Sequence, residues 1–216
     1  EKDIRKWRGE NAQRHKFEVT RGEIELTTAQ VMELYVLNKR GQARRHMFED
    51  NGGVVPGEVK LNTSLKEKRV LPVIDVSERE TKLRPEDVKK ITDTLTDAQK
   101  RLADKMQWYV SNPVSRQGNE VTVEMYGYPK FMAKDYWPIV TDKRSTPPKE
   151  QEARNSESAK SSIKNLGMTK NTNRNANNPI VIEDVFDAFT RHVDQMSSYA
   201  GLMIPLSDLH KVLNYG

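Results

Sequence analysis

The sequence predicts a mainly α protein: an irregular multi-helix domain with extended connectors and one long mobile polar loop. Apolar residues recur every three or four positions in 88–109 and in 182–200, which is the spacing of one helix face. Thr27 and Gln30 have the spacing of a capping box, which marks a helix start. Residues 141–178 carry too few apolar side chains to bury a core, so we expect a flexible polar arm there.

Composition limits the classes of protein to consider. The chain has 216 residues, 35% hydrophobic and 31% charged, with no cysteine, which allows one lean core and excludes disulfides and thiolate sites. It lacks an apolar run of membrane-spanning length and a signal peptide, so we expect a soluble protein. Because it begins without Met in a helix-like segment, we interpret it as a piece of a larger polypeptide, with a truncated helix or linker at 1–25 and a single helical domain at 26–216.

The first half of the chain predicts these elements in order. Charged residues surround a weak apolar pattern at 3–17, which suggests the end of an amphipathic helix. The capping box at Thr27 begins a helix that we expect to run through Phe48 and to stop before Gly52-Gly53. Residues 54–82 contain an interrupted apolar stretch typical of an extended connector or an edge strand.

The next helix begins at Arg84-Pro85, with proline in its first turn. Within its stripe Thr96 and Gln99 repeat the earlier capping-box spacing, so we expect two helices joined at 94–96. The repeated five-residue motif has two explanations, duplication and convergent capping chemistry, and convergence is the simpler one.

Proline and glycine set the expected ends of the later helices. Asn112-Pro113 should end the second helix of the stripe, and Asn119 should cap a short successor that ends near Gly127. A helix with acids in its first turn follows at 182–200, and a separate short helix should follow Pro205.

Five aromatic residues fall within twelve positions of the chain. Such a group can stack on nucleic-acid bases, but aromatic residues at this density more often fill a core between short helices. We therefore predict a structural aromatic cluster of Tyr126, Tyr128, Phe131, Tyr136 and Trp137.

The sequence contains no recognisable catalytic centre. The phosphate-loop, dinucleotide-binding and serine-hydrolase motifs are missing, and carboxylate pairs such as Glu120 and Glu124 fit a solvent-facing helix surface. No two histidines have the spacing of metal ligands on one helix face, and the nearest candidates are His46 beside Glu49 and Asp50, and His192 beside Asp194. We therefore predict a protein that is not an enzyme and has no cofactor and no metal.

Net charge of +5 is concentrated in one segment. Residues 141–180 carry eight Lys or Arg and four acids, which suits a solvated loop or, as the alternative, contact with phosphate. The candidate nucleic-acid contacts are Lys39, Arg40, Arg44, Arg45, Lys143, Arg144, Lys164, Lys170 and Arg174.

Short motifs along most of the chain carry a resemblance to a known family. They include Leu26–Tyr35, Arg45-His46-Met47, Gly52-Gly53-Val54, Tyr126-Gly127-Tyr128 and Asp135–Ile139. Together the chain from Leu26 to Leu213 resembles the large polyvalent protein-associated domains, which are modules of very long polyproteins of bacteriophages and other mobile elements.

This resemblance implies a role in delivery with the phage genome, or in scaffolding or protection inside the newly entered cell. The implied location is the virion or the bacterial host cytoplasm, and the family supplies no catalytic residues. Our first hypothesis is therefore a non-enzymatic structural or interaction module whose partners are other modules of the polyprotein or virion proteins. The alternative is a nucleic-acid-binding module that uses the basic arm. The sequence leaves the oligomeric state open.

Overall fold

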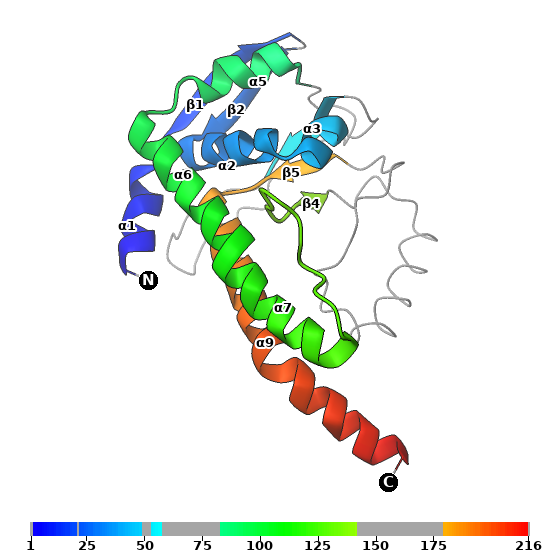
Figure 1. Ribbon diagram of the computed structural model, residues 1–216. Helices are drawn as coiled ribbons and strands as arrows, with labels where there is room; N and C mark the ends of the chain where they lie inside the picture. The colour runs from blue at the N-terminus through cyan, green and yellow to red at the C-terminus, as the bar shows by residue number, and fades with distance from the viewer. Residues whose placement is uncertain (1, 21, 49–52, 58–82, 142–178, 216) are drawn as a thin grey trace.

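The computed structural model describes residues 2–20, 22–48, 53–57, 83–141 and 179–215. Helices make up most of this part of the chain, which confirms the predicted mainly α class. Figure 1 shows the α-helices α1 (Lys2–Glu10), α2 (Thr28–Lys39), α3 (Gly41–Phe48), α5 (Pro85–Thr92), α6 (Asp97–Tyr109), α7 (Ser115–Tyr126) and α9 (Val185–Tyr215). A π-helix, η1 (Val110–Val114), joins α6 to α7.

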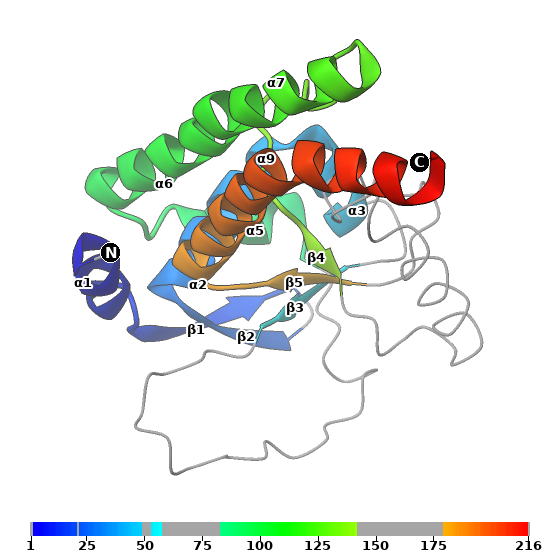
Figure 2. The same ribbon diagram turned by 90° about the horizontal axis from the view of Figure 1, so that it is seen from below.

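Two small sheets accompany the helices. The first is an antiparallel hairpin of β1 (Arg14–Val19) and β2 (Gly22–Thr27). The second has the order β3-β5-β4, in which β5 (Ile180–Ile182) pairs in parallel with β3 (Val54–Pro56) and antiparallel with β4 (Val140–Thr141). Figure 2 shows these strands on one side of α2 and α9, with α6 and α7 on the other.

Most of the predicted connector at 54–82 and of the polar arm at 141–178 lies outside the described residues. In the ranges that the structure does describe, no helix combines the length and apolarity needed to span a bilayer.

The N-terminal segment differs from its prediction. The expected helix at 3–17 is wrong beyond Glu10, where α1 ends, and the chain then enters the β1–β2 hairpin. Phe17 and Ile24 face each other across this hairpin and belong to the same buried cluster as Leu26. Buried and exposed residues alternate along β2, as expected for a strand with one face on the core. The charged residues on the other face obscured this alternation in the sequence.

Helix α2 is the centre of the core. Its capping box is formed as predicted, because the Thr27 hydroxyl accepts from the Gln30 amide and the Gln30 side chain accepts from the Thr27 amide. Nearly all of its side chains are buried, since α5, α6, α9 and β2 surround it. The predicted single helix to Phe48 is wrong at Arg40, where the backbone is extended and α3 begins with Gly41, a poor residue for a helix interior.

The helices after Arg84 follow the predicted starts. Pro85 opens α5, and Thr96 with Gln99 forms the second capping box, which confirms two helices rather than one. At the start of α5 the Asp87 carboxylate accepts from the backbone amides of Arg84, at 2.9 Å, and Thr20, at 3.1 Å. This bond to Thr20 ties the β1–β2 hairpin to α5.

Two prolines lie inside helices, so the predicted ends there are wrong. At Pro113 the helix widens into η1 and continues into α7, and the Ser115 hydroxyl donates to the Val110 carbonyl at 2.9 Å. A π-turn changes which carbonyl each amide meets, which accommodates a residue without an N–H. At Pro205 α9 continues to Tyr215. Proline has no N–H for the carbonyl of Gly201, four residues earlier, but Gly201 is exposed, so water can bond to that carbonyl instead.

Helices α7 and α9 lie side by side at the edge of the molecule (Figures 1 and 2). A side chain on Gly118 would come within 2.3 Å of Met196 and 2.9 Å of Phe131, so this glycine permits the close approach. Val121, Tyr199 and Met203 form a second, smaller buried cluster here. Helix α7 ends as predicted at Gly127, which takes the left-handed conformation.

Candidate functional site

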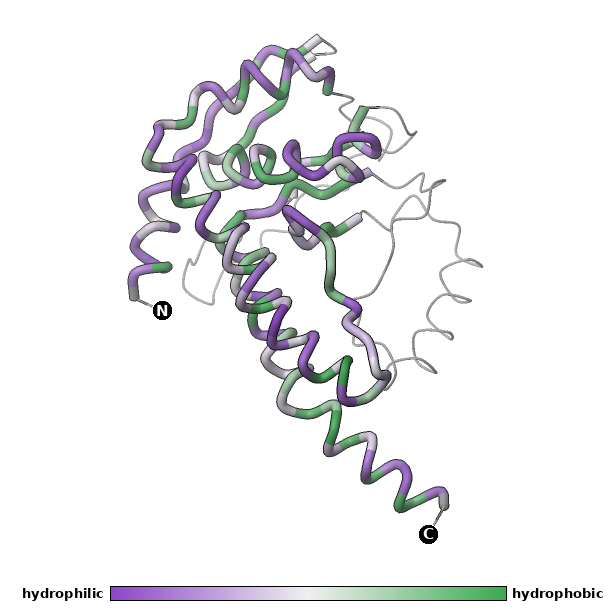
Figure 3. The backbone as a smooth tube through the Cα atoms, in the orientation of Figure 1, coloured by the Kyte–Doolittle hydropathy of each residue, from purple (hydrophilic) through white to green (hydrophobic). Residues whose placement is uncertain are grey.

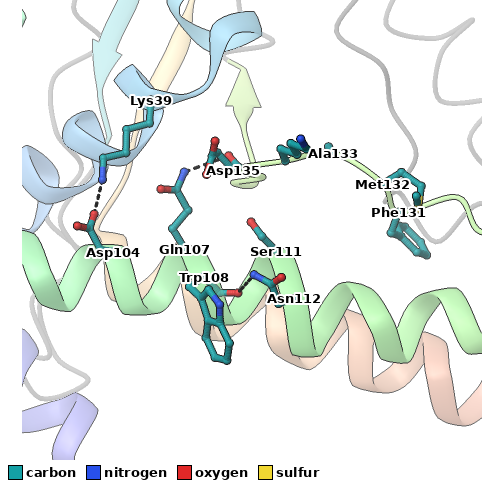
Figure 4. A pocket seen from close by; sticks show the side chains of 11 residues that line it. Lys39, Asp104, Gln107, Trp108, Ser111, Asn112, Phe131, Met132, Ala133 and Asp135 are labelled. Carbon is teal, nitrogen blue, oxygen red and sulfur yellow. Dashed lines mark hydrogen bonds and ion pairs between the residues drawn. The ribbon is translucent and has the colours of Figure 1, made fainter.

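A groove of about 500 Å³ opens between the α6–η1 helix and the segment that runs back from α7 toward β4. Figure 4 shows Gln107 and Ser111 pointing from the helix toward the part of this segment that carries Ala133 and Asp135. We call this feature the α6 groove, and it is lined by Lys39, Asp104, Gln107, Trp108, Ser111, Asn112, Phe131, Met132, Ala133, Lys134 and Asp135.

The segment is clamped at its first end by α7. The Asn119 side chain accepts from the Phe131 amide at 2.8 Å and donates to the Phe131 carbonyl at 2.9 Å. The Thr122 hydroxyl accepts from the Lys130 amide at 3.3 Å. Asn119 therefore lies in the middle of α7 and does not cap a new helix, as the sequence had suggested.

The second end is held by α6 and η1. The Gln107 amide donates to the Asp135 carbonyl at 3.0 Å, and the Ser111 hydroxyl donates to the Tyr136 carbonyl at 3.2 Å. Asp135 has a φ of 49°, a left-handed conformation that is uncommon outside glycine. The bond from Gln107 to the Asp135 carbonyl helps to hold this conformation.

Trp137 anchors the segment in the core. Its side chain is fully buried, and its indole donates to the Glu33 carboxyl at 3.3 Å. The Arg40 guanidinium donates to the Trp137 carbonyl at 2.6 Å and lies over the Tyr136 ring, 5.1 Å from the ring centroid. Arg40 thus links the break between α2 and α3 to the wall of the groove.

Glu33 is a buried carboxyl behind this wall. One of its oxygens accepts from Trp137, and among the described residues the other makes no hydrogen bond of good geometry, although the Glu183 backbone lies close enough to oppose part of the pKa rise. Burial raises the pKa of Glu33 well above its usual value, and the nearby negative charge of Glu183 adds to this rise. The folded state therefore favours the protonated carboxyl.

We expect Glu33→Gln to raise the free energy of unfolding near pH 8 by about 1–3 kcal/mol, because glutamine can keep the bond from Trp137 but does not ionise in the buried site. A raised pKa in the folded state contributes stability that is fully present below the usual pKa and is lost as pH rises through the folded value. Urea denaturation of both proteins near pH 8 and near pH 4 measures this, and the two should converge at the lower pH.

Glu25→Gln is the matched control, because the Glu25 side chain is exposed on β2 and pairs with Arg14. It should change stability by no more than about 0.5 kcal/mol at either pH. A Glu33→Gln protein no more stable than the parent near pH 8 would contradict a raised pKa for Glu33.

The histidines lie away from the groove. His46 and His192 are buried, and the His192 ring lies 5.3 Å from the Tyr136 ring between centroids. Burial lowers the pKa of His192 to about 4, and the charge of Arg191 adds to this effect. Glu49 and Asp50, the carboxylates named beside His46, lie outside the described residues, and within the described ranges no three His, Asp or Glu side chains gather as metal ligands would.

The predicted basic residues have mixed positions. Lys39 forms an ion pair with Asp104 and lies over the Tyr35 ring, and Arg40 is committed to Trp137 and Tyr136. Arg44 is exposed and Arg45 is half-buried on α3. The structure therefore does not join these four into one free basic surface, and the others lie outside the described residues: Lys143, Arg144, Lys164, Lys170 and Arg174.

The five aromatic residues do not form one cluster. Trp137 is buried in the main core with Tyr136 packed at its edge, and Phe131 packs against Tyr199 in the second cluster. Tyr126 and Tyr128 are exposed, with the Lys130 ammonium 3.3 Å from the centroid of the Tyr126 ring. The prediction of a shared core cluster is therefore wrong for these two tyrosines, which flank the left-handed Gly127 at the end of α7.

Sequence reasoning missed the groups that shape the site, namely Glu33, Gln107, Ser111 and Asn119. Glu33 was visible in the sequence, because it is the one charged residue in the run Val31–Leu37, whose other members are aliphatic, methionine or tyrosine. A carboxylate in such a run is usually paired or protonated. The other three are polar residues on amphipathic helices, and nothing in the sequence distinguishes them from solvent-facing neighbours.

Two of the polar groups that line the groove are already engaged within the fold. The lining carboxylate of Asp104 is in an ion pair with Lys39, and the lining hydroxyl of Ser111 donates to a carbonyl. Comparison of the chain with protein-family models, with curated proteins and with solved structures returned no match.

Proposed function

We propose that this protein is a non-enzymatic interaction module that binds an extended segment of another polypeptide in the α6 groove. The observation that carries the proposal is the exposure of Met132, Ala133 and Lys134 between two clamps. The hydrogen bonds that hold the segment belong to its neighbours, Lys130, Phe131, Asp135, Tyr136 and Trp137.

The chemistry of the groove favours a polypeptide as the ligand. A non-helical, exposed stretch of main chain offers N–H and C=O groups that a second extended chain can meet. Met132 supplies an adaptable apolar surface at its rim, and Trp108 is 61% exposed on the helix below. The charges of Lys39 and Asp104 neutralise each other, and Lys134 lies next to Asp135, so the groove suits a peptide without a large net charge.

The identity of the partner rests on the resemblance given above. We propose that the bound segment belongs to another module of the same phage or mobile-element polyprotein, or to a virion protein. The corresponding location is the virion or the bacterial host cytoplasm. Recognition of a linear segment suits such a role because the linkers between modules of a polyprotein are themselves linear.

A displayed library of random linear peptides, selected against the protein, tests the proposal. We expect enriched peptides whose affinity, measured by fluorescence anisotropy, falls by about tenfold or more in Asn112→Tyr, which fills the groove, and in Met132→Asp, which places a charge at its rim. Gln117→Tyr is the matched control, because Gln117 is exposed on α7, one to two helical turns beyond Asn112, and does not line the groove.

Two results would overturn this proposal. One is the absence of any enriched peptide, or enriched peptides that bind Asn112→Tyr as well as they bind the parent protein. The other is binding of single- or double-stranded oligonucleotides, weakening steeply with added salt, in a protein that selects no peptide. The second result would establish the nucleic-acid alternative.

A further inference from the structure

The C-terminal part of α9 extends past the end of α7 and leaves the body of the molecule (Figure 1). Tyr199 and Met203 are the last buried side chains on this helix within the described residues. From Leu206 to Asn214 every residue except Ser207 is exposed. This part of the helix thus lacks the tertiary contacts that stabilise most helices in water.

Four leucines line one face of this projecting part. Apolar positions recur along it in Figure 3, and the side chains are exposed by 43% to 75%. Their spacing of four, three and four residues is that of a coiled-coil seam. We call Leu202, Leu206, Leu209 and Leu213 the C-terminal stripe. The polar residues Asp208, Lys211 and Asn214 lie at the other positions of the repeat, where Lys211 donates to Asp208 at 2.9 Å.

We infer that the C-terminal stripe is a self-association surface on which α9 of a second copy of this chain docks in antiparallel orientation. The order of spacings reads the same from either end of the stripe. In an antiparallel pair Leu206 of one copy therefore meets Leu209 of the other, and Leu202 meets Leu213. Such a surface is complementary to itself about a two-fold axis, which is the commonest symmetry of soluble oligomers.

The residues that flank the C-terminal stripe are compatible with a second copy of the chain as the partner. The positions beside the seam, which set partner choice in coiled coils, hold Met203, Pro205, His210 and Val212. None of them is an Asp, Glu, Lys or Arg, so two copies meet without like charges from these residue types across the seam. The charged Asp208 and Lys211 pair with each other within one helix, away from the seam.

The area of the stripe sets the expected strength. Five exposed apolar side chains, the four leucines and Val212, bury on the order of 1,000 Å² when two copies pair, which is at the lower limit for a specific interface. We therefore expect a dimer that dissociates on dilution. Its interface is separate from the α6 groove, so peptide binding and self-association can succeed or fail independently.

Disulfide trapping tests both the pairing and its direction, because the chain contains no cysteine. Leu202→Cys and Leu213→Cys proteins are oxidised separately and as an equal mixture. We expect a disulfide-linked heterodimer in the mixture and little crosslinking of either protein alone, since the two positions are about 16 Å apart along one helix. Equal crosslinking of Leu202→Cys with itself would indicate a parallel pair and would overturn the antiparallel arrangement.

A second measurement does not depend on oxidation. Sedimentation of the unmodified chain over a range of concentrations should show a monomer–dimer equilibrium, and Leu209→Glu should remain monomeric with unchanged helix content. Val123→Glu is the matched control, because Val123 is an exposed apolar residue on α7, and it should dimerise as the parent does. A parent chain that is monomeric at every concentration, or a Leu209→Glu chain that still dimerises, would overturn the inference.

Discussion

Replacement of Trp137 by alanine should lower the free energy of unfolding by about 3–5 kcal/mol, the usual cost of truncating a buried tryptophan. The indole is fully buried in the main core, and it is the hydrogen-bond donor to Glu33. Alanine therefore leaves both a cavity and a buried carboxyl without its donor. Urea denaturation followed by circular dichroism measures the loss.

The same substitution should also lower the affinity of the α6 groove for peptides, since Trp137 anchors the segment that forms its wall. Trp108→Ala is the matched control: Trp108 is exposed on α6, so its removal should change stability by no more than about 0.5 kcal/mol. Similar losses of stability for the two variants would contradict the assignment of Trp137 as the anchor.

His192 should make the protein sensitive to acid. Its pKa lies near 4 in the folded state against 6.5 ordinarily, so stability is fully present above the ordinary value and is lost as pH falls toward the folded value. The difference of about 2.5 pKa units corresponds to about 3 kcal/mol lost between neutral pH and pH 4. Glu33 acts in the opposite direction over its own range, because its pKa is raised.

A comparison of variants isolates the contribution of His192. His192→Gln removes the titrating ring, so its free energy of unfolding should fall by about 3 kcal/mol less than that of the parent over the same pH interval. Gln195→Ala is the matched control, because Gln195 is exposed on the same helix three residues away and does not titrate, and it should follow the parent curve. Parallel curves for the parent and His192→Gln would contradict a lowered pKa for His192.

Local helix chemistry was predictable from the sequence. The two capping boxes at Thr27 and Thr96, the proline start at Pro85 and the glycine end at Gly127 all depend on residues within four positions of one another. Such signals act through the nearest backbone groups, so they need no knowledge of the rest of the fold.

Features set by distant contacts were not predictable in the same way. Pro113 and Pro205 both indicated a helix end, but η1 accommodates the first and the second lies in an exposed stretch. The hairpin at 14–27 depends on burial of Phe17 and Ile24 against α2 and its neighbours, and the surrounding charges concealed its alternation. Propensity is a weak guide wherever tertiary packing decides the outcome.

The candidate site was the least predictable part. Its wall is a non-helical segment whose position is fixed by Asn119, Gln107 and Arg40, each from a different element. Polar residues that bond to a remote backbone have no periodic signature. Only Glu33, a lone acid in an apolar run, offered a hint of the buried contacts behind it.

The π-turn at η1 has a geometric consequence for the rod formed by α6 and α7. Each added residue turns the face of a helix by about 100°, so a local change from α to π winding rotates α7 relative to α6. The first half of the rod packs against α2 and the second half against α9. Insertion or deletion of one residue between Tyr109 and Ser115 would point one half away from its neighbour, so chain length is constrained there even where side-chain identity is not.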